Sequence, residues 1–311
     1  MKNLIITSDI VITRLNQIVD EARKRGPVKL AVAFGQDIHS IQAVDAAVKE
    51  GIAIPTIYGD KNIIARNAEN AGVDISAWNI VDEPSDVKAV ALAVADVAAG
   101  NADVLMKGLV STDKYMRGIL NKDAGLVPPK AVLSHVSVVE LPKYPKLLSI
   151  ADVAIIPLPD FKQKTIIIKY LTQVANALGV ETPKIACIAP SEQLLPSVIS
   201  STEAALLAKM GDRGQLGNVI VDGPLSLDVS LYPEVAEEKK VKGSAVAGHA
   251  DCLLFPNIES GNVFFKAATH FVDAPIAAIV VGAKKPCVLT SRGDTPLTKL
   301  YSIALAALRC R

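Results

Sequence analysis

The sequence has no cysteine or histidine pairs at the spacings that bind metal ions. Its four cysteines, Cys187, Cys252, Cys287 and Cys310, form no CxxC pair, and most of them fall in or beside apolar runs. Cysteines in such places are typically buried and reduced. The four histidines show no HExxH or related spacing. We therefore expect reduced thiols, no disulfide and no structural metal.

Long apolar runs are missing as well. Charges, glycine or proline interrupt every apolar stretch well before the roughly 20 residues that span a membrane. The N-terminal stretch MKNLIITSDIVITRL lacks the apolar core and cleavage site of a signal peptide. Lys and Arg number 33 and Asp and Glu number 32, so the near-zero net charge predicts no general affinity for nucleic acid or anionic membranes. These absences predict a cytoplasmic protein.

The usual fingerprints of nucleotide binding are absent. No GxGxxG follows the first predicted strand, and no GxxxxGK[ST] occurs in the chain. Residues 211–217 have GxxGxxG spacing, but they precede a predicted strand, whereas phosphate-binding glycines follow one. The sequence therefore supports neither a dinucleotide site nor a P-loop.

What the sequence does have is a regular alternation of short β-branched runs with longer amphipathic stretches. Half of its 311 residues are hydrophobic, which is enough for a sizeable core, and the length suggests about two domains. The predicted strands are 30–34, 52–58, 79–82, 104–106, 184–188, 218–222, 252–255 and 277–281. The predicted helices are 38–50, 62–70, 84–100, 112–121, 161–178, 192–210 and 292–311. Such alternation predicts mostly parallel sheets with helices on both faces.

Residues 131–157 depart from this alternation. Two apolar runs flank Pro142–Lys146, a pattern that is typical of an antiparallel hairpin with a proline-containing turn. We expect the chain to pass into a second domain in this region. The predicted domains are 1–138 with 289–311, and 139–288.

In open parallel sheets, ligands bind beyond the carboxyl ends of the strands, so polar residues that follow strands are informative. The first such segment follows strand 104–106 and contains Lys107, Gly108, Ser111 and Thr112, with Arg117 in the helix beyond. A glycine turn and hydroxyls at a helix N-terminus present backbone N–H groups to an anion. The same residues also suit a capped helix with two surface charges.

Two further segments lie in the predicted second domain. Asp222 and Asp228 flank Gly-Pro after strand 218–222, which is also ordinary turn chemistry. The third segment follows strand 252–255 and contains Asn257, Gly261, Asn262 and Lys266. Here a glycine would let a ligand approach the backbone and a helix N-terminus would favour a phosphate, or the segment is a capped helix start.

The fourth segment, Thr290-Ser291-Arg292-Gly293-Asp294, precedes the last predicted helix. Arginine suits bidentate phosphate binding, although Ser291 also fits a simple N-cap. Taken together, the four segments place glycines, hydroxyls and cations at several strand ends. An anionic substrate bound in a cleft requires this arrangement.

These segments carry a family resemblance. They read MKGLVSTDKYMRGIL (Met106–Leu120), DGPLSLD (Asp222–Asp228), GHADCLLFPNIESGNVFFKA (Gly248–Ala267) and TSRGDTPLTKLYSIALA (Thr290–Ala306). The chain resembles the phosphate acetyltransferase/phosphate butyryltransferase family over nearly its whole length, and most closely the butyryl branch.

The resemblance implies a two-domain, three-layer αβα fold like that of isocitrate and isopropylmalate dehydrogenases, with the active site in the interdomain cleft. It implies the reaction acyl-CoA + phosphate ⇌ acyl phosphate + CoA, by direct transfer in a ternary complex. The expected acyl group is butyryl or another short or branched chain. Coenzyme A (CoA) and phosphate are then substrates, no metal or redox cofactor is needed, and the protein is a homo-oligomer.

The resemblance also implies roles for single residues. Ser291 and Arg292 match the pair at the reacting carbonyl and phosphate, and Arg117 matches an anion-binding arginine. The remaining expected substrate-binding residues are Lys107, Gly108, Ser111, Thr112, Asp222, Asn257, Gly261, Asn262 and Lys266. The acetyl branch has an aspartate, thought to be the base, where this chain has Thr298. The nearest carboxylate is Asp294, which we expect in the opening turn of the last helix, either as the base or as a cap.

Other functions remain open at this point. The chain could prefer acetyl-CoA, or resemble more distantly a long-chain acyl-carrier-protein:phosphate transferase. The same architecture hosts metal-dependent decarboxylating dehydrogenases, but these need clustered aspartates, for which Asp222 and Asp228 are the only candidates. A non-catalytic CoA-binding protein is a further alternative.

Overall fold

The computed structural model describes residues 11–291 and 293–310 and divides into two compact units, each described here by itself. The outer unit contains residues 15–133 and 276–310. The middle unit contains residues 11–14 and 134–275. The chain thus changes unit upstream of the predicted boundaries at 138/139 and 288/289. The whole antiparallel hairpin belongs to the middle unit, and β10 belongs to the outer unit, where it pairs with β11. The division into domains stays a prediction.

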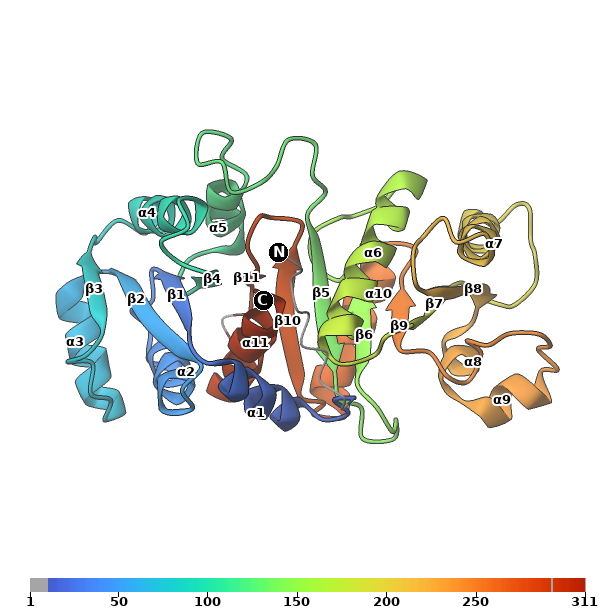
Figure 1. The fold of residues 1–311 in the computed structure, drawn as a ribbon, viewed down its shortest axis with the longest axis horizontal. Helices are drawn as coiled ribbons and strands as arrows, with labels where there is room; N and C mark the ends of the chain where they lie inside the picture. Colours follow the sequence, from blue (N-terminus) through green and yellow to red (C-terminus); the bar gives the residue numbers. More distant parts are fainter. Residues whose placement is uncertain (1–10, 292, 311) are drawn as a thin grey trace, which may run out of the picture. The chain divides into compact units, whose positions relative to one another are not determined.

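The outer unit is an α/β layer structure built on a mostly parallel sheet (Figure 1). Its strands are β1 (Val28–Ala33), β2 (Ala53–Gly59), β3 (Asn79–Asp82), β4 (Val104–Lys107), β10 (Ile276–Val281) and β11 (Cys287–Val288). Its helices are α1 (Leu15–Arg25), α2 (Ile38–Lys49), α3 (Lys61–Ala71), α4 (Asp86–Ala98), α5 (Thr112–Ile119) and α11 (Pro296–Arg309). The strand order is β3-β2-β1-β4-β11-β10, and only β10 runs antiparallel to its neighbour β11.

This strand order contains a topological switch point between β1 and β4. The connections through α2 and α3 move outward in one direction, whereas the connection through α4 returns past β2 and β1 to reach β4. Because such crossovers are right-handed, α4 lies on the opposite face from α2 and α3. In folds of this kind, ligands bind at the carboxyl edge of the sheet beside such a switch point.

The middle unit repeats the same architecture around a hairpin. Its strands are β5 (Ser134–Val139), β6 (Leu148–Ala151), β7 (Lys184–Ile188), β8 (Ile220–Leu225) and β9 (Cys252–Leu254), in the order β5-β6-β9-β7-β8. Its helices are α6 (Phe161–Ala177), α7 (Ile199–Asp212), α8 (Leu227–Leu231), α9 (Pro233–Glu238) and α10 (Ile258–Phe271). Strands β6, β9, β7 and β8 are parallel, and β5 pairs antiparallel with β6, so the predicted hairpin is confirmed.

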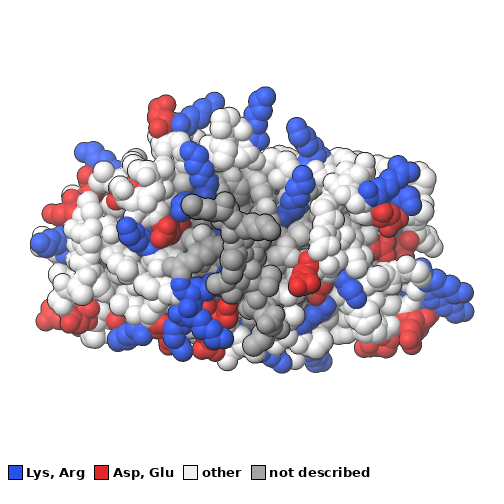
Figure 2. All heavy atoms as spheres, in the orientation of Figure 1, with Lys and Arg blue, Asp and Glu red and all other residues white. Residues whose placement is uncertain are grey.

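The core and surface agree with the composition. The central parallel strands are buried runs rich in β-branched and small residues, and α11 buries most of its residues. All four cysteines are free thiols, three of them buried and Cys310 half-buried. Basic and acidic side chains are interspersed over the face shown in Figure 2. Among the described residues, no helix has the length and apolarity that crossing a membrane requires.

Two predicted helices begin later than expected. The segment 192–198 is a loop, because Glu192 accepts hydrogen bonds from Ser226 and Pro196 interrupts a helical path, so α7 begins at Ile199. The last helix begins at Pro296, where the fixed φ of proline suits the first helical position, and Thr295 is its N-cap. The patterns also missed α1, α8, α9 and the two-residue strand β11.

Candidate functional site

The backbones that follow β1 and β4 touch directly at the switch point. The Gly108 N–H donates to the Ala33 carbonyl at 2.9 Å, and the Leu109 N–H donates to the Phe34 carbonyl at 2.8 Å. A Cβ on Gly108 would overlap the Phe34 carbonyl oxygen and lie 2.7 Å from the Gly35 Cα, so only glycine fits. Phe34 itself has a left-handed φ of 56°, which is strained for a bulky residue. The predicted Gly108 therefore lies where the two backbones pack closely at the carboxyl edge of the sheet.

Lys107, expected to offer its charge to an anion, is buried at 3% exposure. Its Nζ donates to the carbonyls of Gly108 (3.3 Å) and Val110 (3.1 Å), so the ammonium group bends back over its own loop. This contact fixes the loop between β4 and α5. The reading of Lys107 as a surface charge is therefore wrong, while its contact with a substrate stays a prediction.

Helix α5 begins as expected, with Ser111 as its N-cap accepting the Lys114 N–H at 3.3 Å. Thr112 is the first helical residue and is exposed. Arg117 is 78% exposed and pairs with Asp113 one turn earlier, through contacts of 3.2 and 3.1 Å. An exposed ion pair of this kind contributes less than about 1 kcal/mol to the free energy of unfolding, so Arg117 can leave Asp113 for a stronger anionic partner at little cost.

The segment after β11 forms a closed turn. The Ser291 N–H donates to Asp294 Oδ2 at 2.6 Å, and the Asp294 N–H donates back to the Ser291 carbonyl at 3.3 Å. Arg292 lies outside the described residues. The expectation that Asp294 caps or opens the last helix is wrong, as is Ser291 as the N-cap, because Thr295 is the N-cap and accepts the Thr298 N–H at 3.2 Å. Asp294 instead anchors the turn that carries Ser291.

A residue that the sequence patterns missed lies against this turn. Lys299, in the first turns of α11, is only 4% exposed, and its Nζ donates to Thr290 Oγ1 (3.4 Å) and the Ser291 carbonyl (3.3 Å). Burial lowers the pKa of this lysine, and the negative charges of Asp37 and Asp294 oppose the shift only in part. One sequence signal could have indicated that Lys299 is buried: it lies four residues before Ile303, on the apolar stripe of the helix.

Strand register brings these pieces to one edge of the outer sheet. Ala33 pairs with Lys107 across β1 and β4, and Met106 pairs with Val288 across β4 and β11. Parallel strands in this register end together, so the segments after β1, β4 and β11 leave the sheet at the same edge. The segments at this edge carry Lys107, Gly108, Ser111, Ser291 and Asp294, and Lys299 lies against the last of them. Contact of these residues with a substrate stays a prediction.

Four predicted residues of the middle unit follow β9, at the start of α10 and along it. Asn257 is the N-cap of α10 and accepts the Ser260 N–H at 2.9 Å. Asn262 Nδ2 donates to the Val153 carbonyl at 3.0 Å. A Cβ on Gly261 would overlap the Asp152 carbonyl oxygen, so the fold itself requires this glycine for the close approach of α10 to the segment after β6. Lys266 is exposed, with its Nζ 5.2 Å from the centre of the Phe265 ring.

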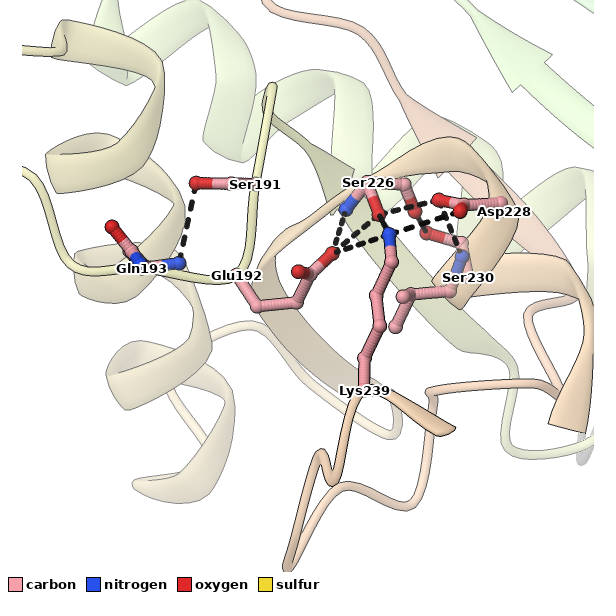
Figure 3. A network of polar contacts seen from close by, with 8 residues as sticks. Ser191, Glu192, Gln193, Ser226, Asp228, Ser230 and Lys239 are labelled. Carbon is pink, nitrogen blue, oxygen red and sulfur yellow. Dashed lines mark hydrogen bonds and ion pairs between the residues drawn. The ribbon is translucent and has the colours of Figure 1, made fainter. Parts of the chain in front are cut away.

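The DGPLSLD segment is held by a polar network (Figure 3). Asp222 Oδ1 accepts the N–H of the following Gly223 at 2.8 Å. Ser226 donates its N–H to Glu192 Oε1 at 3.1 Å and its hydroxyl to both Glu192 and Asp228. Figure 3 shows Lys239 reaching the same group of atoms, with its Nζ 2.9 Å from Asp228 Oδ2. The hydrogen bond from Ser226, followed by that from Lys239, lowers the pKa of Asp228 to about 2. The Asp228 carboxylate thus has a structural role.

This network makes a testable prediction about acid stability. Because the folded pKa of Asp228 is below its unfolded value of about 3.9, its contribution is full above that value and disappears as the pH falls towards 2. The side chain is 49% exposed, so screening limits the contribution to about 1 kcal/mol or less. We expect Asp228→Asn to lower the Tm at pH 7 and to match the wild type near pH 2. Thermal melts across this range, with Asp212→Asn as a surface control, test it; a Tm gap independent of pH contradicts it.

Among the described residues, no group of three His, Cys, Asp or Glu side chains is placed to hold a metal ion. Asp228, one of the two candidate metal ligands, is committed to Ser226 and Lys239. Fold and site together define an α/β protein of the doubly wound type, with backbone amides, hydroxyls and cations at the carboxyl edge of its sheets.

Comparison with known proteins narrows this class. Residues 83–307 match the family described as phosphate acetyl/butaryl transferase. The chain is 44% identical over 298 residues to the phosphate butyryltransferase of Clostridium acetobutylicum, covering 96% of this chain and 98% of that protein. It is 40% identical to the phosphate acetyltransferase of Thermotoga maritima, covering 94% and 99%. The chain therefore belongs to the phosphate acetyl/butyryl transferase family and is a transferase.

Solved structures agree on the fold. A branched-chain phosphotransacylase from Enterococcus faecalis superposes with a TM-score of 0.80 at 29% identity, covering 91% of this chain and 99% of that one. A 4-hydroxythreonine-4-phosphate dehydrogenase from Klebsiella pneumoniae superposes with a TM-score of 0.54 at 12% identity, covering 91% and 100%, which shows a likeness of fold alone. The predicted α/β fold of dehydrogenase type is confirmed.

Proposed function

We propose that this protein transfers an acyl group between CoA and inorganic phosphate: acyl-CoA + phosphate ⇌ acyl phosphate + CoA. The observation that carries the proposal is the 44% identity to a phosphate butyryltransferase over 96% of the chain. CoA and phosphate are substrates in this proposal, and no further cofactor takes part. The protein acts in the cytoplasm as a homo-oligomer.

The acyl group that we propose is butyryl or another short or branched chain. Two phosphate butyryltransferases, at 44% and 43% identity, support this choice, as does the likeness to a branched-chain phosphotransacylase. Acetyl-CoA is the second candidate, because a phosphate acetyltransferase is 40% identical over 94% of the chain. The two identities differ by four percentage points, and the chain-length series below decides between the two substrates.

The proposed chemistry assigns roles to the two turns of the outer unit. A phosphate oxygen attacks the thioester carbonyl, a tetrahedral intermediate forms, and its collapse expels the CoA thiolate. Negative charge develops on the carbonyl oxygen, where Ser291 and backbone N–H groups would stabilise it. Arg292 and Arg117 would hold the phosphate in line for attack. Asp294 would accept the thiol proton in the reverse direction.

The same proposal assigns substrate contacts to the predicted residues within each unit. In the outer unit they belong to the loop and cap between β4 and α5: Lys107, Gly108, Ser111 and Thr112. In the middle unit they are Asp222, within β8, and four residues that follow β9: Asn257, Gly261, Asn262 and Lys266. The caps and close approaches described above keep the backbone of these segments rigid, as precise positioning requires.

A chain-length series tests the proposed substrate. We expect butyryl-CoA to react with phosphate at a higher kcat/KM than acetyl-CoA, because the chain is more similar to the butyryl enzymes. One extra methylene in an apolar pocket is worth about 1–3 kcal/mol, so the preference should be measurable. Thiol release from acetyl-, butyryl-, isobutyryl- and hexanoyl-CoA gives the comparison. A kcat/KM more than about tenfold higher for acetyl-CoA would reverse the assignment.

A further inference from the structure

Lys299 combines burial, charge and an unusual set of partners. It lies one turn into α11, beside Leu300 and close to Ile303, both core residues. Its Nζ contacts two uncharged oxygens, the Thr290 hydroxyl and the Ser291 carbonyl, at 3.4 and 3.3 Å. Thr290 is itself buried, whereas Ser291 is exposed. The lysine therefore links the core of the outer unit to the exposed turn that carries Ser291.

The charged groups around Lys299 leave its ammonium only partly compensated. Asp37, the N-cap of α2, and Asp294, in the turn, act on it from a distance, and no ion pair joins either to Lys299 within the described ranges. On β4, the charged residue is Lys107, which contacts its own loop. Helix α1 meets the far end of α11, where Arg25 donates to the Leu308 carbonyl at 3.2 Å.

Unsatisfied polar atoms lie on the α2 side. Asp37 Oδ1 accepts the Ser40 N–H at 2.9 Å, but Asp37 Oδ2 and Ser40 Oγ are buried without a hydrogen-bond partner among the described residues. Natural proteins keep few such atoms, and each has a specific cause such as local strain, a catalytic role or an ordered water or ion.

A second buried lysine gives a contrast. Lys164 in the middle unit is equally buried, but it forms an ion pair with Glu203, as a charge in a core normally does. Lys299 donates instead to uncharged oxygens, with Asp37 and Asp294 acting only from a distance, and burial lowers its pKa. A long apolar residue would fill the same space without the desolvation cost. The fold gains little from the charge, so its contacts with Thr290 and Ser291 need another explanation.

We propose that Lys299 is a positioning residue of the acyl-transfer site, which clamps Thr290 and Ser291 and so fixes the turn that ends at Asp294. The inference rests on the proposed function, because it concerns the turn that would meet the reacting carbonyl and phosphate. The Lys299 Nζ donates to the Ser291 carbonyl, while Asp294 Oδ2 accepts the Ser291 N–H. Two anchors on one residue define its orientation, and misplacing it by about 1 Å can cost about 100-fold in rate.

Lys299→Met tests this clamp, because methionine keeps the unbranched stem and removes only the donor. We expect kcat to fall by about 30- to 100-fold, while the KM for acyl-CoA changes less than about threefold. The Tm should stay within about 4 °C of the wild type, because the cost of the buried charge disappears along with the hydrogen bonds. The matched control is Lys285→Met. Lys285 pairs with Asp103 at the opposite edge of the same two strands, and its kcat should be unchanged.

A double-mutant cycle with Thr290→Val separates a clamp from general damage. If Lys299 acts through Thr290 and its neighbour, Thr290→Val should lower kcat in the wild type and add less than about twofold in Lys299→Met. Two fully additive losses would contradict the clamp. So would a kcat within about threefold of wild type in Lys299→Met, or a loss of kcat that simply follows a large fall in Tm.

A measurement that needs no activity keeps the inference separate from the proposed function. Wild-type protein that releases no CoA in the presence of phosphate would overturn the proposed function. Amide-hydrogen exchange then still tests whether Lys299 clamps the turn. We expect faster exchange at the Ser291 and Asp294 amides in Lys299→Met, and no change in Lys285→Met. Exchange in Lys299→Met equal to that of the wild type would overturn the clamp.

Discussion

Replacing Arg292 with alanine is expected to lower the kcat/KM of phosphate-dependent CoA release by at least about 100-fold. This is the scale of losing one preorganised electrostatic contact in a transition state. The expectation comes from the Thr-Ser-Arg-Gly-Asp sequence, whose serine lies at the carboxyl edge of the outer sheet beside Asp294 and Lys299. Steady-state kinetics at varied phosphate concentration should show the largest change in the kcat/KM for phosphate.

Two further variants make the Arg292 result specific. Arg292→Lys should restore little activity, because lysine keeps the charge but cannot form a planar, bidentate contact with phosphate. Arg66→Ala on α3, an exposed arginine elsewhere in the same unit, should behave like the wild type. Near-normal kinetics in a folded Arg292→Ala protein would remove this arginine from the proposed site.

Asp294→Asn is expected to lower the rate of CoA acylation by acyl phosphate about 100-fold at neutral pH. In that direction the CoA thiol, with a pKa near 8.5, must lose its proton, and a positioned base supplies a factor of about this size. Raising the pH towards 8.5 should restore much of the rate, because free thiolate then becomes abundant. The pH dependence of the acylation rate, measured for wild type and variant, gives the comparison.

The structure gives Asp294 a second role that the same experiment separates from the first. Its Oδ2 accepts the Ser291 N–H, and asparagine retains an acceptor oxygen while alanine does not. If Asp294 only anchors the turn, Asp294→Asn should keep a rate close to wild type, and Asp294→Ala should lose it at every pH. A wild-type rate in Asp294→Asn at neutral pH would exclude the base role.

Local sequence patterns predicted most of the fold, because each depended on neighbouring residues. Short β-branched runs located the parallel strands, amphipathic stretches located most helices, and the hairpin followed from two apolar runs around Pro142–Lys146. Gly51 ends α2 with a left-handed φ of 69°, as its place after the amphipathic run indicated. The start of α11 was placed too early because Ser291 resembles a cap. The proline five residues later was the stronger signal.

The site was predicted less completely, because its decisive contacts join segments far apart in the sequence. Gly108 is required by the Phe34 carbonyl, and no local pattern indicates that contact. Gly261 is similarly required by the Asp152 carbonyl, which lies far from it in the chain. The sequence patterns treat a lysine as an exposed charge, so they did not predict that Lys107 and Lys299 are buried. Burial of a charge depends on tertiary packing, which composition and spacing do not record.

The most direct test of the proposed acyl transfer is the stoichiometry of CoA release from butyryl-CoA with and without phosphate. Free thiol reports CoA, and hydroxylamine trapping reports acyl phosphate in the same sample. The account predicts negligible release without phosphate, and with phosphate one acyl phosphate for each CoA released. Release of CoA at the same rate without phosphate, or without any acyl phosphate, would contradict the account and indicate a thioesterase.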